Sequence, residues 1–180
     1  MNIQYCSDLH LEFPENKAFL KENPLLPVGN ILLLEGDIVP FAVMDKHNDF
    51  FYYVADNFES TYWIPGNHEY YYSKITQRSG AFSENIQSNV VLLNNKAVVH
   101  DKTRFVISTL WSRINPAYQF QIERGMSDFH VIKYNGYRFS AERFNQLHSD
   151  CINFIKPEQA FEGKTIVVSH HMPTFMNYYC

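Results

Sequence analysis

The chain has 180 residues, of which 46% are hydrophobic and 19% are charged, a composition typical of a soluble globular domain. Its formal net charge of −4 at pH 7 argues against a general nucleic-acid coat, because such proteins need a basic face. The sequence shows no apolar run of the roughly 20 residues that a membrane span requires, and no secretory signal. We therefore expect one domain over residues 1–180, without contact to a membrane, in the reducing cytoplasm.

Short apolar runs that end in Gly or Ser predict buried strands, because core strands are shorter than helices. Four such runs are Ile3–Cys6, Ile31–Leu34, Thr61–Ile64 and Thr165–Val168. Helical spacing and helix-start signals predict helices over Lys17–Glu22, Phe41–Phe58 and Ser83–Gln87, and a longer helix from Ser140 through Phe154 to a stop at Pro157.

The middle of the chain predicts a second sheet that packs on the first. Three runs joined by Asn-Asn and Asp-Lys turn signals indicate its strands, at Val90–Leu93, Lys96–Val99 and Phe105–Leu110. The pattern then breaks down, and Arg113–Asn135 is predicted to be an irregular insertion.

A polar motif follows each of the four predicted core strands. In chain order these motifs are Ser7-Asp8-Leu9-His10, Gly36-Asp37, Gly66-Asn67-His68-Glu69 and Ser169-His170-His171. Because ligands gather outside the carboxyl ends of the strands in open α/β sheets, we expect the four motifs to converge in one crevice. Carboxylate, amide and imidazole groups gathered there suit hard or borderline divalent metals.

Each motif also has a simpler interpretation when it is taken alone. The i, i+2 spacing would place Asp8 and His10 on the same side of an extended backbone, but the same pair also fits a polar surface loop. Asp37, at a buried strand end, must be paired or metal-bound, unless it caps a helix that begins near Phe41. Gly66 is expected to allow a sharp turn. Only the four motifs together, in this order, favour a metal site.

The ordered set resembles the calcineurin-like metallophosphoesterases, whose pattern is D-x-H, G-D, G-N-H-[DE], one or two His, and finally G-H-x-H. The first four elements match residue for residue. Ser108–Ser112, Met126–Phe129 and the His-His-x-Pro form of the fourth motif are similar to one bacterial-type branch of that family. The resemblance runs from Met1 to the last residues. No G-H-x-H occurs up to Cys180, so we expect the domain to lack its C-terminal portion.

The resemblance implies an α/β, four-layer fold in which a two-sheet β-sandwich is flanked by helices. It also implies two divalent metal ions, Mn²⁺ first, with Fe, Zn or Ni as alternatives. One metal site would comprise Asp8, His10 and Asp37. The other would comprise Asp37 as the bridging ligand, Asn67 and His170. Each site would take one more His from the absent motif.

By the same resemblance, His68 stays free of metal and is the catalytic residue, which stabilises charge or protonates the leaving oxygen. A hydroxide bridging the metals would attack phosphorus, because metals lower the pKa of bound water. The expected partner is therefore a small phosphate-ester substrate, either a phosphomonoester or a phosphodiester. The expected activity is that of a metal-dependent phosphatase or phosphodiesterase, a hydrolase.

Two other functions stay open at this point. The absent last motif fits a catalytically weak or inactive binding or scaffold module with the same fold, whereas an intact His68 favours the enzyme. A nuclease is disfavoured by the acidic net charge and the lack of a basic stripe. The insertion and the cluster Tyr70–Tyr72 are expected to shape substrate choice in either case.

Several further residues have no assigned role. Glu12 and Glu69 are candidates for supporting the metal ligands from behind, and the role of His171 is open. The remaining histidines, His47, His100, His130 and His148, have no motif around them and are expected to be structural or on the surface. An uncovered edge near Phe175–Cys180 would favour self-association.

Overall fold

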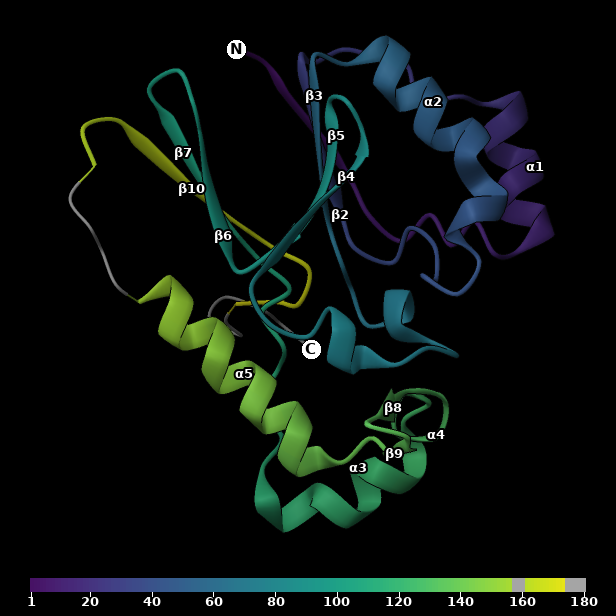
Figure 1. The fold of residues 1–180 in the computed structure, drawn as a ribbon, viewed down its shortest axis with the longest axis vertical. Helices are drawn as coiled ribbons and strands as arrows, with labels where there is room; N and C mark the ends of the chain where they lie inside the picture. The colour runs from purple at the N-terminus through teal and green to yellow at the C-terminus, as the bar shows by residue number, and fades with distance from the viewer. Residues whose placement is uncertain (157–160, 174–180) are drawn as a thin grey trace, which may run out of the picture.

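Two β-sheets form the centre of the protein in the computed structural model, which describes residues 1–156 and 161–173 (Figure 1). The first sheet has the order β1-β2-β3-β5-β4, formed by Ile3–Cys6, Ile31–Glu35, Ser60–Ile64, Val90–Asn94 and Phe82–Gln87 respectively. Its neighbouring strands are parallel, except that β4 runs antiparallel to β5. The second sheet has the order β10-β7-β6, formed by Lys164–Ser169, Thr103–Ser108 and Lys96–His100. The predicted α/β fold with two sheets is confirmed.

The burial of the central strands β2, β3 and β5 on both faces explains their continuous apolar runs. Side chains of both sheets meet in one buried cluster, formed by Ile31, Leu33, Ile64, Leu93, Phe105, Ile107 and Val168. The opposite face of the first sheet packs on α2 (Asn48–Asn57), where Phe51 and Val54 join Leu32, Leu34 and Trp63. Helix α1 (Pro14–Glu22) lies with α2 on the outer side of this sheet (Figure 1).

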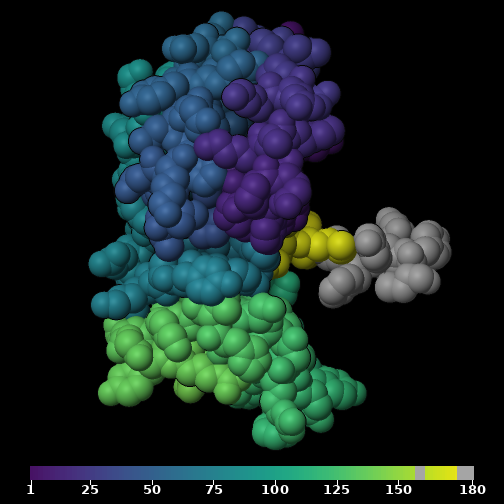
Figure 2. Space-filling view, turned by 90° about the vertical axis from the view of Figure 1, so that its right-hand side faces the viewer, coloured from purple at the N-terminus to yellow at the C-terminus, as the bar shows by residue number. Residues whose placement is uncertain are grey.

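A separate lobe lies beyond the carboxyl ends of the strands, drawn in green below the N-terminal half in Figure 2. It comprises η4 (Pro116–Tyr118), α3 (Gln119–Gly125), α4 (Asp128–Val131), the hairpin β8 (Lys133–Tyr134) and β9 (Tyr137–Arg138), and α5 (Ala141–Ile155). Its core includes Trp111, Phe129, Phe139 and Phe144. The prediction of an irregular insertion over Arg113–Asn135 is therefore wrong, because these short elements share a core with α5.

Helix α5 begins as the sequence predicts. Ser140 is its N-cap, and the Ser140 hydroxyl accepts a hydrogen bond from the N–H of Arg143. A second cap comes from α3, since Glu123 Oε1 accepts a hydrogen bond of 2.6 Å from the N–H of Ala141. This contact fastens the insertion to α5.

The segment Ser83–Gln87 is a strand, not the predicted helix. Phe82 and Ile86 both pack against the core between the first sheet and α2. Their spacing of four residues fits one face of a helix and also one face of a strand. Pairing with β5 decides between the two, from Phe82↔Asn94 through Gln87↔Val90.

The strand β5 joins the first sheet rather than the predicted second one, through the parallel pairs that start at Thr61↔Val90. Asn95 has φ 48°, so the chain turns sharply there and enters the second sheet as β6. The Ser108 hydroxyl donates a 2.7 Å hydrogen bond to Asn95 Oδ1 and holds the corner. The Asn-Asn signal thus marks a corner between sheets instead of a hairpin.

The predicted helix over Phe41–Phe58 is shorter than expected. A 3-10 helix, η1 (Met44–His47), precedes α2, and two more, η2 (His68–Tyr70) and η3 (Ile75–Gln77), follow β3. The predicted helix stop at Pro157 and the edge near Phe175–Cys180 lie outside the described residues. Among the described residues, no helix combines the length and hydropathy needed to cross a membrane.

Candidate metal centre

The loop after β1 brings Asp8 and His10 together by a route that differs from the predicted one. Both residues have positive φ, 57° and 45°, so the backbone is left-handed at each rather than extended. The N–H groups of Asp8 and His10 donate hydrogen bonds of 3.0 Å to the carbonyls of Gly36 and Asp37. The loop is therefore held along the next strand end by its backbone, with Asp8 exposed and His10 half-buried.

Asp37 lies at the centre of the group and is 5% exposed. Ligand atoms of Asp8, His10 and Asp37 all lie within 4.8 Å of one another. Asp37 Oδ2 is 4.0 Å from His10 Nε2, and Asp37 Oδ1 is 3.6 Å from His170 Nε2. The alternative role of Asp37 as a helix cap is wrong, because its Oδ1 accepts the N–H of His68 at 3.0 Å and the next helix starts at Met44.

His170 follows β10 and reaches the centre from the second sheet. Its Nδ1 lies 2.8 Å from the carbonyl oxygen of Glu35, which can only accept, so Nδ1 carries the proton. The other nitrogen, Nε2, faces Asp37 and carries the lone pair whenever the ring is neutral. This arrangement is usual for a metal-binding histidine, whose other nitrogen donates to a carbonyl or carboxylate.

Two glycines make the close approach of these loops possible. A Cβ at Gly36, where φ is 89°, would overlap the ring of His170 and lie 2.8 Å from the backbone N of Gly66. A Cβ at Gly66 would overlap Asp37 Oδ1 and lie 2.7 Å from His170 Nε2. The predicted sharp turn is not the reason for Gly66, which lies outside the positive-φ region. The reason is the space that the ligands occupy.

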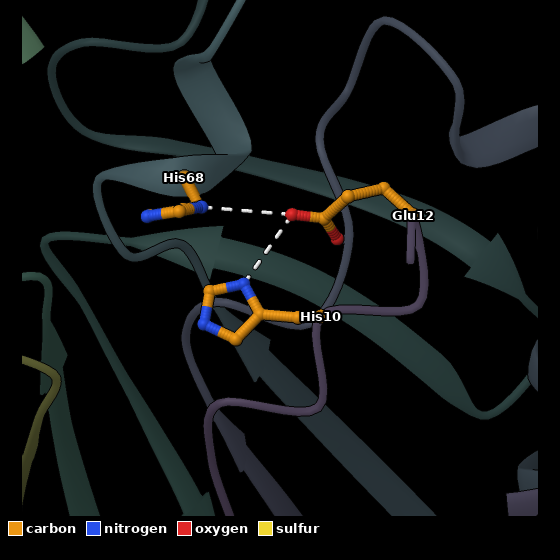
Figure 3. Close-up of side chains that lie close together, drawn as sticks. All are labelled: His10, Glu12 and His68. Atoms are coloured by element: carbon orange, nitrogen blue, oxygen red, sulfur yellow. Dashed lines mark hydrogen bonds and ion pairs between the residues drawn. The ribbon is translucent and has the colours of Figure 1, made fainter. Parts of the chain in front are cut away.

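Glu12 connects two histidines of the site (Figure 3). Its Oε1 lies 3.3 Å from His10 Nδ1 and 3.5 Å from His68 Nδ1. The first contact is a hydrogen bond, and the second is an ion-pair distance that is long for a hydrogen bond. Because a carboxylate only accepts, Glu12 favours the proton on Nδ1 of both rings and leaves both Nε2 atoms for other partners.

The electrostatics around His68 favour its protonated form. Burial lowers the pKa of His68, but the Glu12 carboxylate and the negative charge of Asp37 outweigh burial, so the pKa is raised above its ordinary value. The ring of His68 also stacks on Tyr71, with centroids 4.0 Å apart and planes at 23°. The side chain is thus held in one orientation by a carboxylate and an aromatic ring.

Asn67 lies between the centre and the lobe. Its Nδ2 donates a 3.0 Å hydrogen bond to Asp128 Oδ1, from α4. The carbonyl oxygen Oδ1 of Asn67 is left for a ligand. The backbone of the same loop is tied to the centre, because the neighbouring His68 N–H donates to Asp37.

Glu69 supports the loops from behind and is fully buried. Its Oε1 accepts hydrogen bonds from the N–H of Ile38 and the indole of Trp63, at 2.8 and 3.1 Å. Its Oε2 accepts from the N–H groups of Asp37 and Gly66, at 2.9 and 2.7 Å. Burial and the charge of Asp37 raise the pKa of Glu69 to about 7, although the hydrogen bonds from the N–H groups of Ile38 and Asp37 lower it.

His171 turns away from the carboxylates. Its ring lies 5.3 Å from that of Trp111 and 6.4 Å from that of Phe144, two core residues of the lobe. Burial, and then the charge of His170, lower the pKa of His171 to about 4, so the ring is neutral at ordinary pH. The contacts of His171 are those of a packing residue that anchors the end of β10.

The histidines outside the motifs do not contribute to the centre. His47 is buried beside α2, and His148 Nδ1 lies 2.5 Å from the carbonyl oxygen of Trp111. His130 Nε2 contacts the carbonyl oxygen of Arg124 at 3.1 Å. These contacts agree with the structural roles expected for His47, His130 and His148.

The donor set fits a divalent cation. His10, Asn67 and His170 each use one side-chain nitrogen for a hydrogen bond to a neighbouring group, so Nε2, Oδ1 and Nε2 are left for a ligand. Asp8 and Asp37 add carboxylate oxygens. Oxygen and imidazole donors in this combination suit Mn²⁺, Fe²⁺ or Zn²⁺.

Comparisons with known proteins agree with the fold and the motifs. A family model described as calcineurin-like phosphoesterase matches residues 1–180. An uncharacterized protein of Acanthamoeba polyphaga mimivirus is 29% identical over 197 residues, covering 96% of this chain and 68% of the viral protein. The crystal structure of phosphopantetheinyl hydrolase from Mycobacterium tuberculosis superposes with a TM-score of 0.65, covering 97% of this chain and 70% of that one. At 16% identity, this last likeness shows a shared fold.

Proposed function

Because the chain belongs to the calcineurin-like phosphoesterase family, we propose that it is a hydrolase in which two divalent metal ions support the cleavage of small phosphomonoesters or phosphodiesters. Asp8, His10 and Asp37 would hold one ion, and Asp37, Asn67 and His170 the other. We propose Mn²⁺ as the metal ion, with Fe, Zn or Ni as the alternatives. The observation that carries the proposal is the pattern of hydrogen bonds made by the proposed ligands. The hydrogen bonds of His10 to Glu12, of Asn67 to Asp128 and of His170 to Glu35 occupy one nitrogen of each side chain and leave its other donor atom for a metal.

Metal ions held by these residues would lower the pKa of a water molecule and neutralise the charge of the phosphoryl oxygens. The protein's own contribution is the fixed placement of the ligands, which requires no rearrangement during the reaction. Asp37 is central to this placement, because it faces His10 on one side and His170 on the other.

His68 is proposed as the proton donor to the leaving oxygen. Its Nδ1 faces Glu12, so a proton for transfer is carried on Nε2 when the ring is charged. The raised pKa of His68 supports this role, since a larger fraction of the ring is protonated near neutral pH. A positioned general acid contributes on the order of 10²- to 10⁴-fold to the rate.

Two substitutions separate the roles of metal ligand and proton donor. His68→Ala is expected to lower kcat about 100-fold while the protein keeps its bound Mn²⁺, because His68 faces the substrate. Asp37→Ala is expected to lose the metal first. Hydrolysis of p-nitrophenyl phosphate and bis(p-nitrophenyl) phosphate, with metal content measured on the same samples, tests both expectations.

Chelation provides the opposite control. Removal of the metal should abolish turnover, and added Mn²⁺ should restore it. Full turnover after exhaustive chelation would contradict the metal-dependent mechanism. Equal loss of metal in His68→Ala and Asp37→Ala would contradict the division of roles, and wild-type protein with Mn²⁺ but without turnover would favour a binding module.

A further inference from the structure

The lobe places one buried carboxylate against the candidate centre. Asp128, in α4, is 3% exposed, and its Oδ1 accepts two hydrogen bonds. One comes from Asn67 Nδ2 at 3.0 Å and the other from the Tyr71 hydroxyl at 2.8 Å. Its Oδ2 is buried and has no hydrogen-bond partner among the described residues. Burial of a half-satisfied carboxylate is costly, so the position calls for a reason beyond packing.

The contact with Asp128 determines which way the Asn67 amide points. A carboxylate accepts hydrogen bonds and donates none, so it pairs only with the NH₂ edge of the amide. The flipped amide would bring its carbonyl oxygen against carboxylate oxygen and lose the 3.0 Å hydrogen bond. With the NH₂ edge held by the lobe, the carbonyl oxygen of Asn67 is directed to the other side, where a metal ligand is needed.

The second hydrogen bond extends the same control to His68. The Tyr71 hydroxyl is anchored on Asp128, and the Tyr71 ring stacks on the His68 imidazole at 4.0 Å between centroids. Tyr71 therefore forms a rigid wall behind one face of the imidazole, while Glu12 holds its Nδ1 edge. Movement of Asp128 would release Asn67 and this wall together.

We propose that Asp128 is a positioning residue, by which the lobe orients Asn67 for the metal and, through Tyr71, His68 for the substrate. The neighbouring Phe129 supplies the rigidity, since it is fully buried and its ring stacks on Phe139 at 5.7 Å in the lobe core. This inference rests on the proposed function, because it assigns Asn67 to a metal and His68 to proton transfer.

Titration of the metal-free protein with Mn²⁺, followed by the paramagnetic resonance signal of free Mn²⁺, tests the inference without any substrate. Asp128→Ala should lower the Mn²⁺ affinity of the weaker of the two sites about tenfold. Loss of a group hydrogen-bonded to a metal ligand usually has an effect of this size. Asp128→Asn should stay within about threefold of wild type, because its carbonyl oxygen can accept the same two hydrogen bonds.

Glu123→Ala is the matched control, since Glu123 is also an acidic residue of the lobe but caps α5 instead of facing the centre. It should lower stability while leaving Mn²⁺ affinity unchanged. Tyr71→Phe keeps the ring and removes the hydroxyl, which accepts only a long 3.4 Å contact from Asn67 Nδ2 while Asp128 accepts the shorter one. This variant should bind Mn²⁺ like wild type and lower kcat on bis(p-nitrophenyl) phosphate severalfold at constant KM.

The outcomes separate this inference from the proposed function. Wild-type affinity in Asp128→Ala, or equal weakening in Glu123→Ala, would overturn the role of Asp128 and leave the metal centre intact. Unchanged kcat in Tyr71→Phe would overturn the part that concerns His68. A wild-type protein that takes up no Mn²⁺ would overturn the proposed function, and the inference with it.

Discussion

The Nδ1 atom of His170 donates a 2.8 Å hydrogen bond to the carbonyl oxygen of Glu35, although the two residues are 135 positions apart in the sequence. Glu35 ends β2 in the first sheet, and His170 directly follows β10 in the second. The hydrogen bond therefore joins the carboxyl end of a strand in the first sheet to that of a strand in the second, at the candidate centre. A cation held between Asp37 and His170 would bridge the same junction, so metal binding should be coupled to folding.

Mn²⁺ should raise the melting temperature of the protein. A ligand at 100 times its Kd stabilises the native state by about 2.7 kcal/mol, which corresponds to roughly 5–10 °C for a domain of this size. His170→Ala should lose most of this increase, whereas His130→Ala, on the surface of the lobe, should keep it. Differential scanning fluorimetry with and without Mn²⁺ measures the effect, and an equal increase in both variants would contradict the assignment of His170.

Glu12→Gln should shift the pH dependence of kcat. The acid form of His68 is the active one in the proposed mechanism, so the contribution of His68 to the rate is complete below its pKa and is lost as the pH rises through it. Glu12 contributes to the raised pKa, and its neutral replacement should lower that pKa. The alkaline limb should therefore move to lower pH.

The control for this shift is Glu15→Gln, because Glu15 is exposed in the first turn of α1. It should leave the pH profile unchanged. An alkaline limb at the same pH in Glu12→Gln and wild type would show that Glu12 does not govern the protonation of His68.

Glu69→Gln should destabilise the protein by about 3 kcal/mol. The amide NH₂ of Gln cannot accept hydrogen bonds, so two of the four buried donors that Glu69 now satisfies would lose their acceptor. Urea denaturation measures the free energy of unfolding. Glu84→Gln is the comparison, since Glu84 forms a partly exposed ion pair with Arg78 at 2.8 Å, and such pairs contribute about 0–1 kcal/mol. A loss in Glu69→Gln no larger than in Glu84→Gln would contradict the structural role.

Gly66→Ala should reduce Mn²⁺ binding, because the added methyl group would occupy space held by Asp37 Oδ1 and the ring of His170. Gly80→Ala is a matched substitution, since a Cβ at Gly80 meets no atom within 4 Å. Calorimetric titration of both variants with Mn²⁺ gives the comparison. Wild-type affinity in Gly66→Ala would mean that the two ligands are not held as closely as the structure shows.

The sequence predicts the main features of the fold and the centre from local patterns. Each strand end that carries Asp8, Asp37, Asn67 or His170 is where its apolar run indicates, because buried strands need continuous apolar residues. The pattern fails for β4, where Phe82 and Ile86 fit a helix and a strand equally well. Pairing with the edge of β5 decides between helix and strand, and a short stretch of sequence does not reveal which segment pairs with which.

The residues that hydrogen-bond to the proposed metal ligands are identified by contacts that the sequence does not reveal. Asp128 is 61 residues from Asn67, and its motif alone gives no indication of which side chain it meets. Glu12, two residues after His10, is the exception: the pattern D-L-H-L-E has a local signal, since a carboxylate so close to a histidine can reach its ring. The left-handed backbone at Asp8 and His10 accompanies the hydrogen bonds with Gly36 and Asp37, and Asp and His are residue types that tolerate it, but neither type requires it.

The most direct test of the metal centre is anomalous diffraction at the manganese edge from crystals soaked in MnCl₂. We expect peaks within coordinating distance of Asp37, one shared with Asp8 and His10 and one with Asn67 and His170. These four residues and Asp37 follow β1, β2, β3 and β10, so the peaks would lie at the carboxyl ends of these strands, where the two sheets meet. His10, Glu12 and His68 also lie close enough to one another to hold an ion. A peak at these three residues instead, or no peak at all, would contradict the proposed metal centre.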